Sequence, residues 1–259
     1  KMPLCRRGSL QVSTDDEPIE NVLACCKEEE RFQSLVLGTK DYFQKTGHTN
    51  AVLGLSGGID SALVATLAVA ALGKDAVTGI LLPSRYSSLG SVEDAEQLAK
   101  NIGITTETLP IEHMHSAFER TMSDSCLEAS GLAEENAQAR IRGLFLMALA
   151  NLQGSLLLAT GNKSELAVGY STMYGDMAGA VSMIGDIYKT DVWVLSNWIN
   201  HNFDECGFDS PPIPKSSISK PPSAELRPGQ LDQDSLPAYS ELDAVLRLHI
   251  DFDMGVDEI

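Results

Sequence analysis

Short apolar runs alternate with longer amphipathic segments along most of this chain. The apolar runs are rich in β-branched and aliphatic residues and lie at 51–55, 76–82, 105–109 and 155–160. Apolar positions at helical spacing occupy the segments around them, at 19–45, 62–72, 91–100, 134–151 and 240–250. Strands that alternate with helices predict a parallel sheet with crossover helices, that is, a doubly wound α/β fold.

Two segments lack this periodicity. We expect residues 1–18 to be a tail or a linker remnant, and residues 19–259 to form one domain. Within that domain, the segment of about 204–229 is rich in Ser, Pro and Lys, which is typical of a mobile loop. We expect it to lie over the site and to become ordered only when substrates bind.

Charge and cysteine usage narrow the classes of partner. The chain carries 36 acidic against 19 basic residues, a formal net charge of −17, which argues against nucleic acid and anionic membranes as partners. The five cysteines show no metal-ligand or C-x-x-C spacing, so we expect reduced thiols and a cytoplasmic location. No apolar run is long enough to span a bilayer.

The strongest chemical signal is the segment Gly54-Leu55-Ser56-Gly57-Gly58-Ile59-Asp60-Ser61, which joins the first strand to an Ala-rich helix. A Ser-Gly-Gly turn at that junction directs backbone N–H groups at one point near the positive end of a helix, which suits a phosphate. A carboxylate beside a phosphate requires a cation between them. Asp60 therefore predicts a nucleotide that carries Mg²⁺.

A second polar turn, Thr160 to Glu165, directly follows the fourth strand. Because the carboxyl ends of parallel strands meet at one edge of the sheet, it should face the first loop. Its hydroxyl, amide, Lys163 ammonium and Glu165 carboxylate are suited to a phosphate and Mg²⁺ wall.

The first loop resembles the Ser-Gly-Gly-x-Asp-Ser loop of the ATP pyrophosphatase (PP-loop) family, whose fold is of the adenine nucleotide alpha hydrolase-like type. From about 32 to 248 the chain is similar to the synthetase domain of NAD⁺ synthetase. The segments that carry this resemblance, besides the two loops, are 82–86, 134–142, 168–176, 189–190 and 220–229.

The resemblance implies a ligase that joins ammonia to the nicotinate carboxylate of deamido-NAD⁺. ATP first adenylates the carboxylate and releases pyrophosphate, and ammonia then displaces AMP. It also implies Mg²⁺ as cofactor and a homodimer that forms through helices flanking the sheet.

The same resemblance assigns roles to individual residues. Asp60, Lys163, Asp176 and Lys189 would be catalytic, and Asp60 and Glu165 would hold Mg²⁺. Asp176 would orient or deprotonate the incoming ammonium, although an Asp that caps a Gly turn is an equal alternative. ATP would contact residues 54–61, Thr160, Lys189 and Ser223. The remaining substrate contacts would come from Arg140, Glu165, Tyr170, Ser171, Thr172 and Met173.

Two interpretations stay open, the source of ammonia and the function itself, and two residue pairs receive separate assignments. Arg140 and Arg142 lie two residues apart on one helix and cannot face the same way, so we assign Arg142 to a structural pairing. The sequence is most similar to the glutamine-dependent branch, whose amidase domain this sequence does not include, so ammonia would be free or delivered by that domain. Alternatives are another amidating PP-loop enzyme and a non-catalytic nucleotide-binding fragment. The His113 and His115 pair is interpreted as a solvated turn rather than a metal site.

Overall fold

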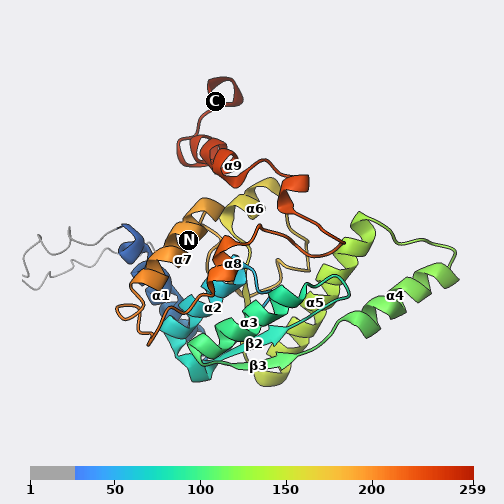
Figure 1. Cartoon of the computed structure of the whole chain (residues 1–259), viewed down its shortest axis with the longest axis horizontal. Helices are drawn as coiled ribbons and strands as arrows, with labels where there is room; N and C mark the ends of the chain where they lie inside the picture. The colour runs from blue at the N-terminus through green and yellow to red at the C-terminus, as the bar shows by residue number, and fades with distance from the viewer. Residues whose placement is uncertain (1–26) are drawn as a thin grey trace, which may run out of the picture.

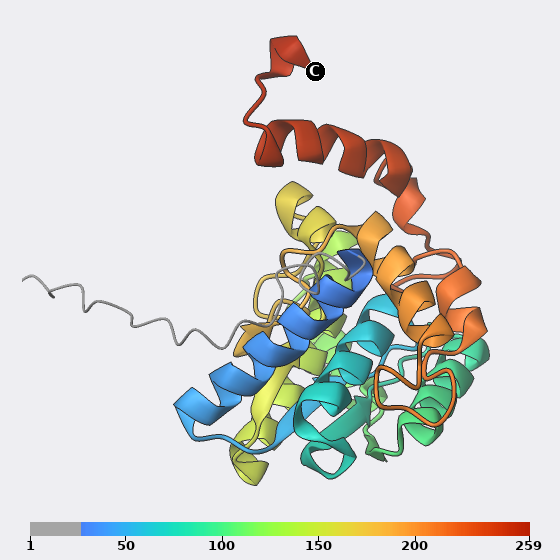
Figure 2. The ribbon, with the colours of Figure 1, turned by 90° about the vertical axis from the view of Figure 1, so that its left-hand side faces the viewer.

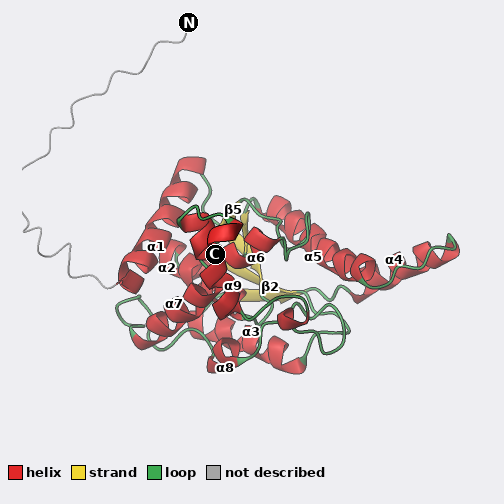
Figure 3. Ribbon diagram, turned by 90° about the horizontal axis from the view of Figure 1, so that it is seen from above, coloured by secondary structure: helices red, strands yellow, loops and turns green. Residues whose placement is uncertain are grey.

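A parallel five-stranded sheet lies at the centre of the computed structural model, which describes residues 27–259 (Figure 3). The predicted tail and the start of the first predicted helix lie outside the described residues. The strand order is β3-β2-β1-β4-β5, and every paired strand is parallel. The strands are β1 (Ala51–Gly54), β2 (Val77–Leu81), β3 (Thr105–Thr108), β4 (Leu156–Ala159) and β5 (Val181–Ser182). The predicted doubly wound sheet is therefore confirmed, and β5 was too short to stand out in the sequence.

Helices cover both faces of this sheet (Figures 1 and 2). One face carries α1 (Lys27–Thr46), α2 (Ile59–Leu72), α3 (Leu89–Ile102) and α7 (Lys189–His201). The other face carries α5 (Leu132–Gln153), with α4 (Glu112–Asp124) packed beside it. The shorter helices are α6 (Lys163–Val168), α8 (Lys215–Ser219) and α9 (Tyr239–Leu246), and a π-helical turn at Arg247–Asp251 extends α9.

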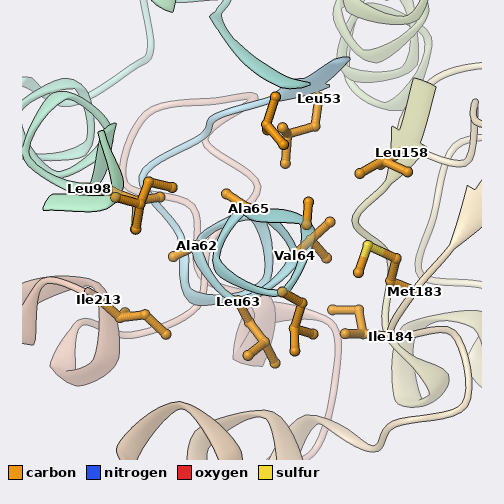
Figure 4. Close-up of a cluster of buried hydrophobic side chains, with 14 of the residues drawn as sticks. Leu53, Ala62, Leu63, Val64, Ala65, Leu98, Leu158, Met183, Ile184 and Ile213 are labelled. Carbon is orange, nitrogen blue, oxygen red and sulfur yellow. The ribbon is translucent and has the colours of Figure 1, made fainter. Parts of the chain in front are cut away.

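The period of two along the strands divides the core between the two faces. Leu53 and Leu158 face α2 in the larger core, whereas Val52 and Leu157 face α5 in the smaller one. Figure 4 looks along α2 and shows apolar side chains around it. Because most residues of α2 are Ala, Val, Leu or Ile, the helix can be buried on all sides from Ser61 to Ala68.

Local signals explain where helices begin and end. The Ser88 side chain accepts a hydrogen bond from Ser91 N at 3.1 Å and caps α3, which begins at Leu89, two residues before the predicted start. Asn162 and Glu165 form a reciprocal capping box that starts α6. Gly103 and Gly154 end α3 and α5 in the left-handed conformation.

The interpretation of His113 and His115 as part of a solvated turn is wrong. Both lie on α4, and His115 is completely buried. Met114, Phe118 and Met122 follow one another at helical spacing, a signal that the polar residues among them obscured.

The segment of about 204–229 contains α8 and lies against α3. Lys220 Nζ lies 2.9 Å from Asp94 Oδ2, and Asn101 Nδ2 donates to the carbonyl oxygen of Pro212 at 3.0 Å. No helix within residues 27–259 combines the length and the apolar composition that a membrane crossing requires.

Candidate active site

Two adjoining cavities open at the carboxyl ends of β1, β2 and β4, where an open parallel sheet binds its ligands. The α5-side cavity, of about 260 Å³, is lined by the ends of these strands and by Arg142, Gly143 and Leu146 of α5. The α7-side cavity, of about 400 Å³, is lined by Asp60, Glu165 and Lys189 among others. Both cavities share Ser56, Ser91, Thr160, Asp176 and residues 223–225, so they form one continuous site.

The glycine loop between β1 and α2 requires glycine at position 57. Its φ is +77°, and a Cβ there would lie 2.0 Å from the carbonyl oxygen of Ser91. The loop therefore passes directly against the N-terminus of α3. Gly58 then caps α2 without a side-chain hydrogen bond, which leaves backbone N–H groups of the first turn available to an anion.

The two serines of this loop bond to each other and to its backbone. Ser56 Oγ and Ser61 Oγ lie 3.0 Å apart, and Gly58 N donates to Ser56 Oγ at 3.2 Å. Ser61 Oγ also donates to the carbonyl oxygen of Gly58 at 3.1 Å. These bonds hold both hydroxyl groups at the mouth of α2. Ser56 Oγ can donate to a phosphate there, and Ser61 Oγ can do so once it releases the carbonyl oxygen of Gly58.

The first turn of α2 and the start of α6 supply two carboxylates to a single buried ammonium. Lys189 Nζ, at the start of α7, forms ion pairs with Asp60 and, at 3.4 Å, with Glu165. Lys189 is 2% exposed. The same ammonium faces the rings of Trp193 and Tyr239, at 5.7 and 5.4 Å from their centroids. Three residues from three separate segments thus form one charged group.

This arrangement raises the pKa values of Glu165 and Lys189. Burial, followed by the charge of Asp60, raises the pKa of Glu165 to about 7, against the opposing influence of Lys189. Burial disfavours the charged form of Lys189, but the charges of Asp60 and Glu165 outweigh it and raise the pKa of Lys189. Lys189 therefore stays cationic, whereas Glu165 changes its protonation near neutral pH.

Asp243 on α9 holds the starts of α6 and α7 together beneath this group. Its carboxylate accepts hydrogen bonds from Ser164 Oγ at 2.5 Å, Thr190 N at 2.8 Å and Thr190 Oγ1 at 2.7 Å. Ser164 Oγ in turn accepts from Lys189 N at 2.9 Å. Ser164 is next to Glu165 in the sequence and Thr190 is next to Lys189, so Asp243 positions both members of the charged group.

Asp232 is a site residue that sequence reasoning missed. It is 4% exposed, lines the α7-side cavity, and accepts a hydrogen bond from Tyr239 Oη at 2.9 Å. Burial raises the pKa of Asp232, and Lys189 counts among the groups that lower it. In the sequence, a single Asp within a polar segment cannot be distinguished from an Asp that is exposed to solvent.

The structure places the two arginines of α5 differently from the sequence interpretation. Arg142 lines the α5-side cavity, where its Nε donates to the carbonyl oxygen of Leu82 at 3.0 Å, and burial lowers its pKa to about 10. Arg140 is exposed and lines neither cavity, and its Nε donates to the carbonyl oxygen of Met173 at 3.2 Å. Of the two arginines, the one that lines the site is thus Arg142, which the sequence interpretation assigned to a structural pairing.

Lys163 also lies apart from the charged group. Its Nζ pairs with Asp186 at 2.8 Å and with Asp251 at 3.0 Å, and lies 4.6 Å from the centre of the Tyr188 ring. It lines neither cavity. In this arrangement the Lys163 ammonium forms ion pairs that connect the start of α6 to the turn after α9, and it does not face the cavities.

The other expected site residues are distributed around the cavities. Asp176, Thr160 and Ser223 line both, and Tyr170 and Ser171 line the α7-side cavity. Thr172 is buried and its backbone N–H donates to Asp176 Oδ1 at 2.7 Å. Burial raises the pKa of Asp176, with the Thr172 hydrogen bonds opposing it.

Comparisons with known proteins agree with this geometry. The sequence model described as NAD synthase matches residues 31–259. The glutamine-dependent NAD(+) synthetase of Synechocystis is 54% identical over 84% of this chain, which spans 38% of that protein. The chain thus spans about two fifths of the length of the curated relatives it matches.

Solved structures extend the likeness to three dimensions. The ADP complex of glutamine-dependent NAD+ synthetase from Acinetobacter baumannii is 40% identical, with a TM-score of 0.72 over 90% of this chain and 41% of that chain. NMN synthetase from Francisella tularensis is 31% identical, with a TM-score of 0.75 over 86% of this chain and 87% of that chain. Because the family match extends over most of its length, the chain belongs to the NAD synthase family.

Proposed function

We propose that this chain is an ATP-dependent ligase that amidates deamido-NAD⁺ to NAD⁺ through an adenylated nicotinate carboxylate. The single observation that carries the proposal is the group formed by Lys189, Asp60 and Glu165 beside the uncapped N-terminus of α2. Membership of the NAD synthase family supports the choice of substrate.

ATP would lie with its phosphates against the glycine loop. The free N–H groups of α2 and the hydroxyl groups of Ser56 and Ser61 would donate to the phosphate oxygens, and Lys189 would add positive charge. Thr160 and Ser223, which line both cavities, would contact ATP as well. The A. baumannii relative was solved with ADP, which supports a nucleotide in this place.

Asp60 and Glu165 fit a magnesium ion. Their charges lie close enough that Asp60 raises the pKa of Glu165, and carboxylate oxygens are preferred ligands of Mg²⁺. When bound, the ion would neutralise charge on the pyrophosphate that leaves. Asn162 and Lys189 would hold the two carboxylates in place.

The chemistry proceeds in two substitutions. A nicotinate carboxylate oxygen attacks the α-phosphorus of ATP, and the bond to the β-phosphate oxygen breaks as pyrophosphate leaves. Ammonia then attacks the carbonyl carbon of the acyl adenylate, and AMP leaves with the bonding electrons. Tyr170, Ser171, Thr172 and Met173, with Arg140 beside Met173, would position deamido-NAD⁺, because effective positioning is most of what this reaction needs.

Asp176 would receive the proton that ammonium must lose. It lines both cavities and its pKa is raised by burial, so its carboxylate is a better base than an exposed one. The ammonia would be free, or would be delivered from glutamine by a domain such as the longer relatives contain. Lys163 remains a catalytic candidate if substrates release it from Asp186 and Asp251.

The test is NAD⁺ formation from deamido-NAD⁺, Mg·ATP and ammonium chloride, with Asp60→Ala measured alongside. We expect turnover that the substitution abolishes. ATP–pyrophosphate exchange in the presence of deamido-NAD⁺ separates an enzyme that only adenylates from a nucleotide-binding fragment, which gives no exchange.

A second substrate deserves the same assay because an NMN synthetase is a structural neighbour. Nicotinate mononucleotide carries the same carboxylate but lacks the adenylate half. A higher kcat/KM for nicotinate mononucleotide than for deamido-NAD⁺ would identify the mononucleotide as the preferred substrate. The proposed ligase chemistry would stay the same. Xanthosine monophosphate serves as the control for other amidating PP-loop enzymes.

We also propose a cytoplasmic location, which the absence of cysteine-pair spacing in the sequence supports. A further proposal is a homodimer that forms through α5. Leu144, Met147 and Leu152 of α5 are 56%, 42% and 82% exposed, which is unusual for side chains of this size on one helix. Sedimentation analysis of Leu144→Asp against the unmodified chain tests the pairing. A monomer in both would overturn it.

A further inference from the structure

A cluster outside both cavities joins α4 to the first turn of α5. His115 and Glu119 are four residues apart on α4, so they share one helix face, and Glu134 reaches the same point from α5. One nitrogen or oxygen atom from each residue lies within 4.8 Å of the others. His115 Nε2 is 3.8 Å from Glu119 Oε1 and 3.8 Å from Glu134 Oε1. In Figure 1, α4 points away from the body of the molecule, and contacts with α5 hold it in place.

The imidazole of His115 is buried without a hydrogen bond. Its side chain is 0% exposed, and neither ring nitrogen has a partner among residues 27–259. An imidazolium paired with carboxylates would draw them to about 2.7–2.9 Å. The separation of 3.8 Å to both oxygen atoms is too long for that bond and leaves Nε2 aimed between two carboxylates.

The carboxylate oxygen atoms that face His115 also accept hydrogen bonds from other side chains. Tyr86 Oη donates to Glu134 Oε1 at 2.9 Å, and Arg85 Nη1 donates to Glu119 Oε1 at 3.0 Å. A carboxylate oxygen has two lone pairs, so each can accept these bonds and still bind a cation. Hydrogen bonds to ligating carboxylates are the usual outer shell of a metal site, because they fix the orientation of the ligands.

The geometry points to a binding site for a divalent transition-metal ion of the Zn²⁺ type, formed by His115, Glu119 and Glu134. One imidazole and two carboxylates favour zinc and its neighbours over Mg²⁺, which takes oxygen ligands. Ligand atoms of a tetrahedral zinc site lie about 3.3 Å apart. The two distances from His115 Nε2 would therefore close by about half an ångström, and the two carboxylate oxygen atoms, which lie within 4.8 Å of each other, would approach as well. Water would take the fourth position.

This ion would be distinct from the magnesium proposed at Asp60 and Glu165, since His115, Glu119 and Glu134 line neither the α5-side nor the α7-side cavity. It would clamp α4 to α5. It would also fix the turn that contains Arg85 and Tyr86, whose neighbours Pro83 and Ser87 line the α5-side cavity. A bound ion would therefore stabilise the wall of the nucleotide site from outside.

The test measures zinc and cobalt binding to the full chain in excess Mg²⁺. We expect one Zn²⁺ per chain by elemental analysis after dialysis, a Co²⁺ absorption spectrum without a thiolate band, and a melting temperature that rises with Zn²⁺ concentration. His115→Gln should remove all three. His113→Gln is the matched control, because this histidine is exposed on the same helix, and it should retain them.

Two further variants keep the test decisive if His115→Gln folds poorly. Glu119→Gln, at a half-buried position, should remove the bound ion, and Tyr86→Phe should weaken Zn²⁺ affinity about tenfold through loss of an outer-shell bond. Cys126→Ser should leave the stoichiometry unchanged. Binding that survives in Glu119→Gln, binding lost in Cys126→Ser, or no binding at all would overturn the proposal and leave an ion-paired cluster.

Discussion

The side-chain amide of Asn162 donates a hydrogen bond of 2.9 Å to Asp60 Oδ1, across 102 residues of sequence. The same side chain accepts from Glu165 N at 3.0 Å and so caps α6. Asn162 is completely buried, and it links the turn after β4 to the first turn of α2. One residue therefore connects the two loops that the sequence placed at one edge of the sheet.

Asn162→Ala should reduce both stability and activity. The lost cap costs about 1 kcal/mol of unfolding free energy, and Asp60 loses a donor that orients it. Urea denaturation and kcat/KM for ATP measure the two effects. Asn162→Ser separates them, because serine caps a helix as well as asparagine but has no amide to reach Asp60. Full activity in Asn162→Ser would show that the bond to Asp60 has no functional role.

Lys189→Met should leave Asp60 and Glu165 as neighbouring carboxylates without their cation. Breaking a buried pair on one side costs about 3–5 kcal/mol, and the loss of a charge directed at the phosphates should lower kcat about 100- to 1000-fold. Denaturation at pH 5 and pH 8 checks the cause. The destabilisation should be smaller at pH 5, where Glu165 is protonated, and an equal loss at both would contradict this account.

Glu165 should make stability fall as pH rises from about 4.5 to 7. Its folded pKa is raised to about 7 from 4.5, so between these values the folded chain binds more protons than the unfolded chain. The contribution is fully present below 4.5 and is lost as pH rises through 7. Denaturant titrations of the unmodified chain and of Glu165→Gln measure it, and the variant should lack this part of the slope. If stability changes with pH equally in both proteins, the pH dependence would be assigned to Asp176 and Asp232, whose pKa values are also raised.

Gly57→Ala should abolish nucleotide binding and destabilise the fold. The new Cβ would meet the Ser91 carbonyl oxygen at 2.0 Å in a backbone with φ of +77°, so the loop must shift away from α3. Calorimetric binding of Mg·ATP and thermal unfolding measure the change. Gly90→Ala is the matched control in the first turn of α3, where a Cβ has nothing within 4 Å. Comparable losses in both variants would contradict the steric explanation.

Glu225→Ala should loosen the segment that covers the site. The Glu225 carboxylate accepts from Ser88 N at 3.2 Å, Ser88 Oγ at 2.9 Å and Ser91 Oγ at 2.7 Å, in a backbone with φ of 49°. Trypsin should therefore cleave faster after Lys215, because Lys220 and Arg227 each precede a proline and resist trypsin. Mg·ATP should slow the cleavage. Glu96→Ala, at an exposed position of α3, is the control. Unchanged cleavage would mean that other contacts hold the segment.

Some features were predictable because they depend on neighbours in sequence. Strand β1, the glycine turn and helix α2 follow one another within about twenty residues, so their apolar pattern and glycines determine the phosphate loop locally. The rule that parallel strands end at one edge then predicted that Asp60 and Glu165 would meet. Helix α4 was missed because its polar side chains conceal its apolar spacing, and β5 because two residues carry no pattern.

Tertiary structure decided which side chains reach the site. The sequence by itself determined the doubly wound sheet, the glycine loop and the family resemblance, since each rests on a short-range pattern. It could not decide between Arg140 and Arg142, place Asp232 beside Lys189, or bring Glu134 to His115. Those relationships depend on how each helix is rotated and on how distant segments pack. Burial of the whole core determines both, and no local sequence pattern encodes them.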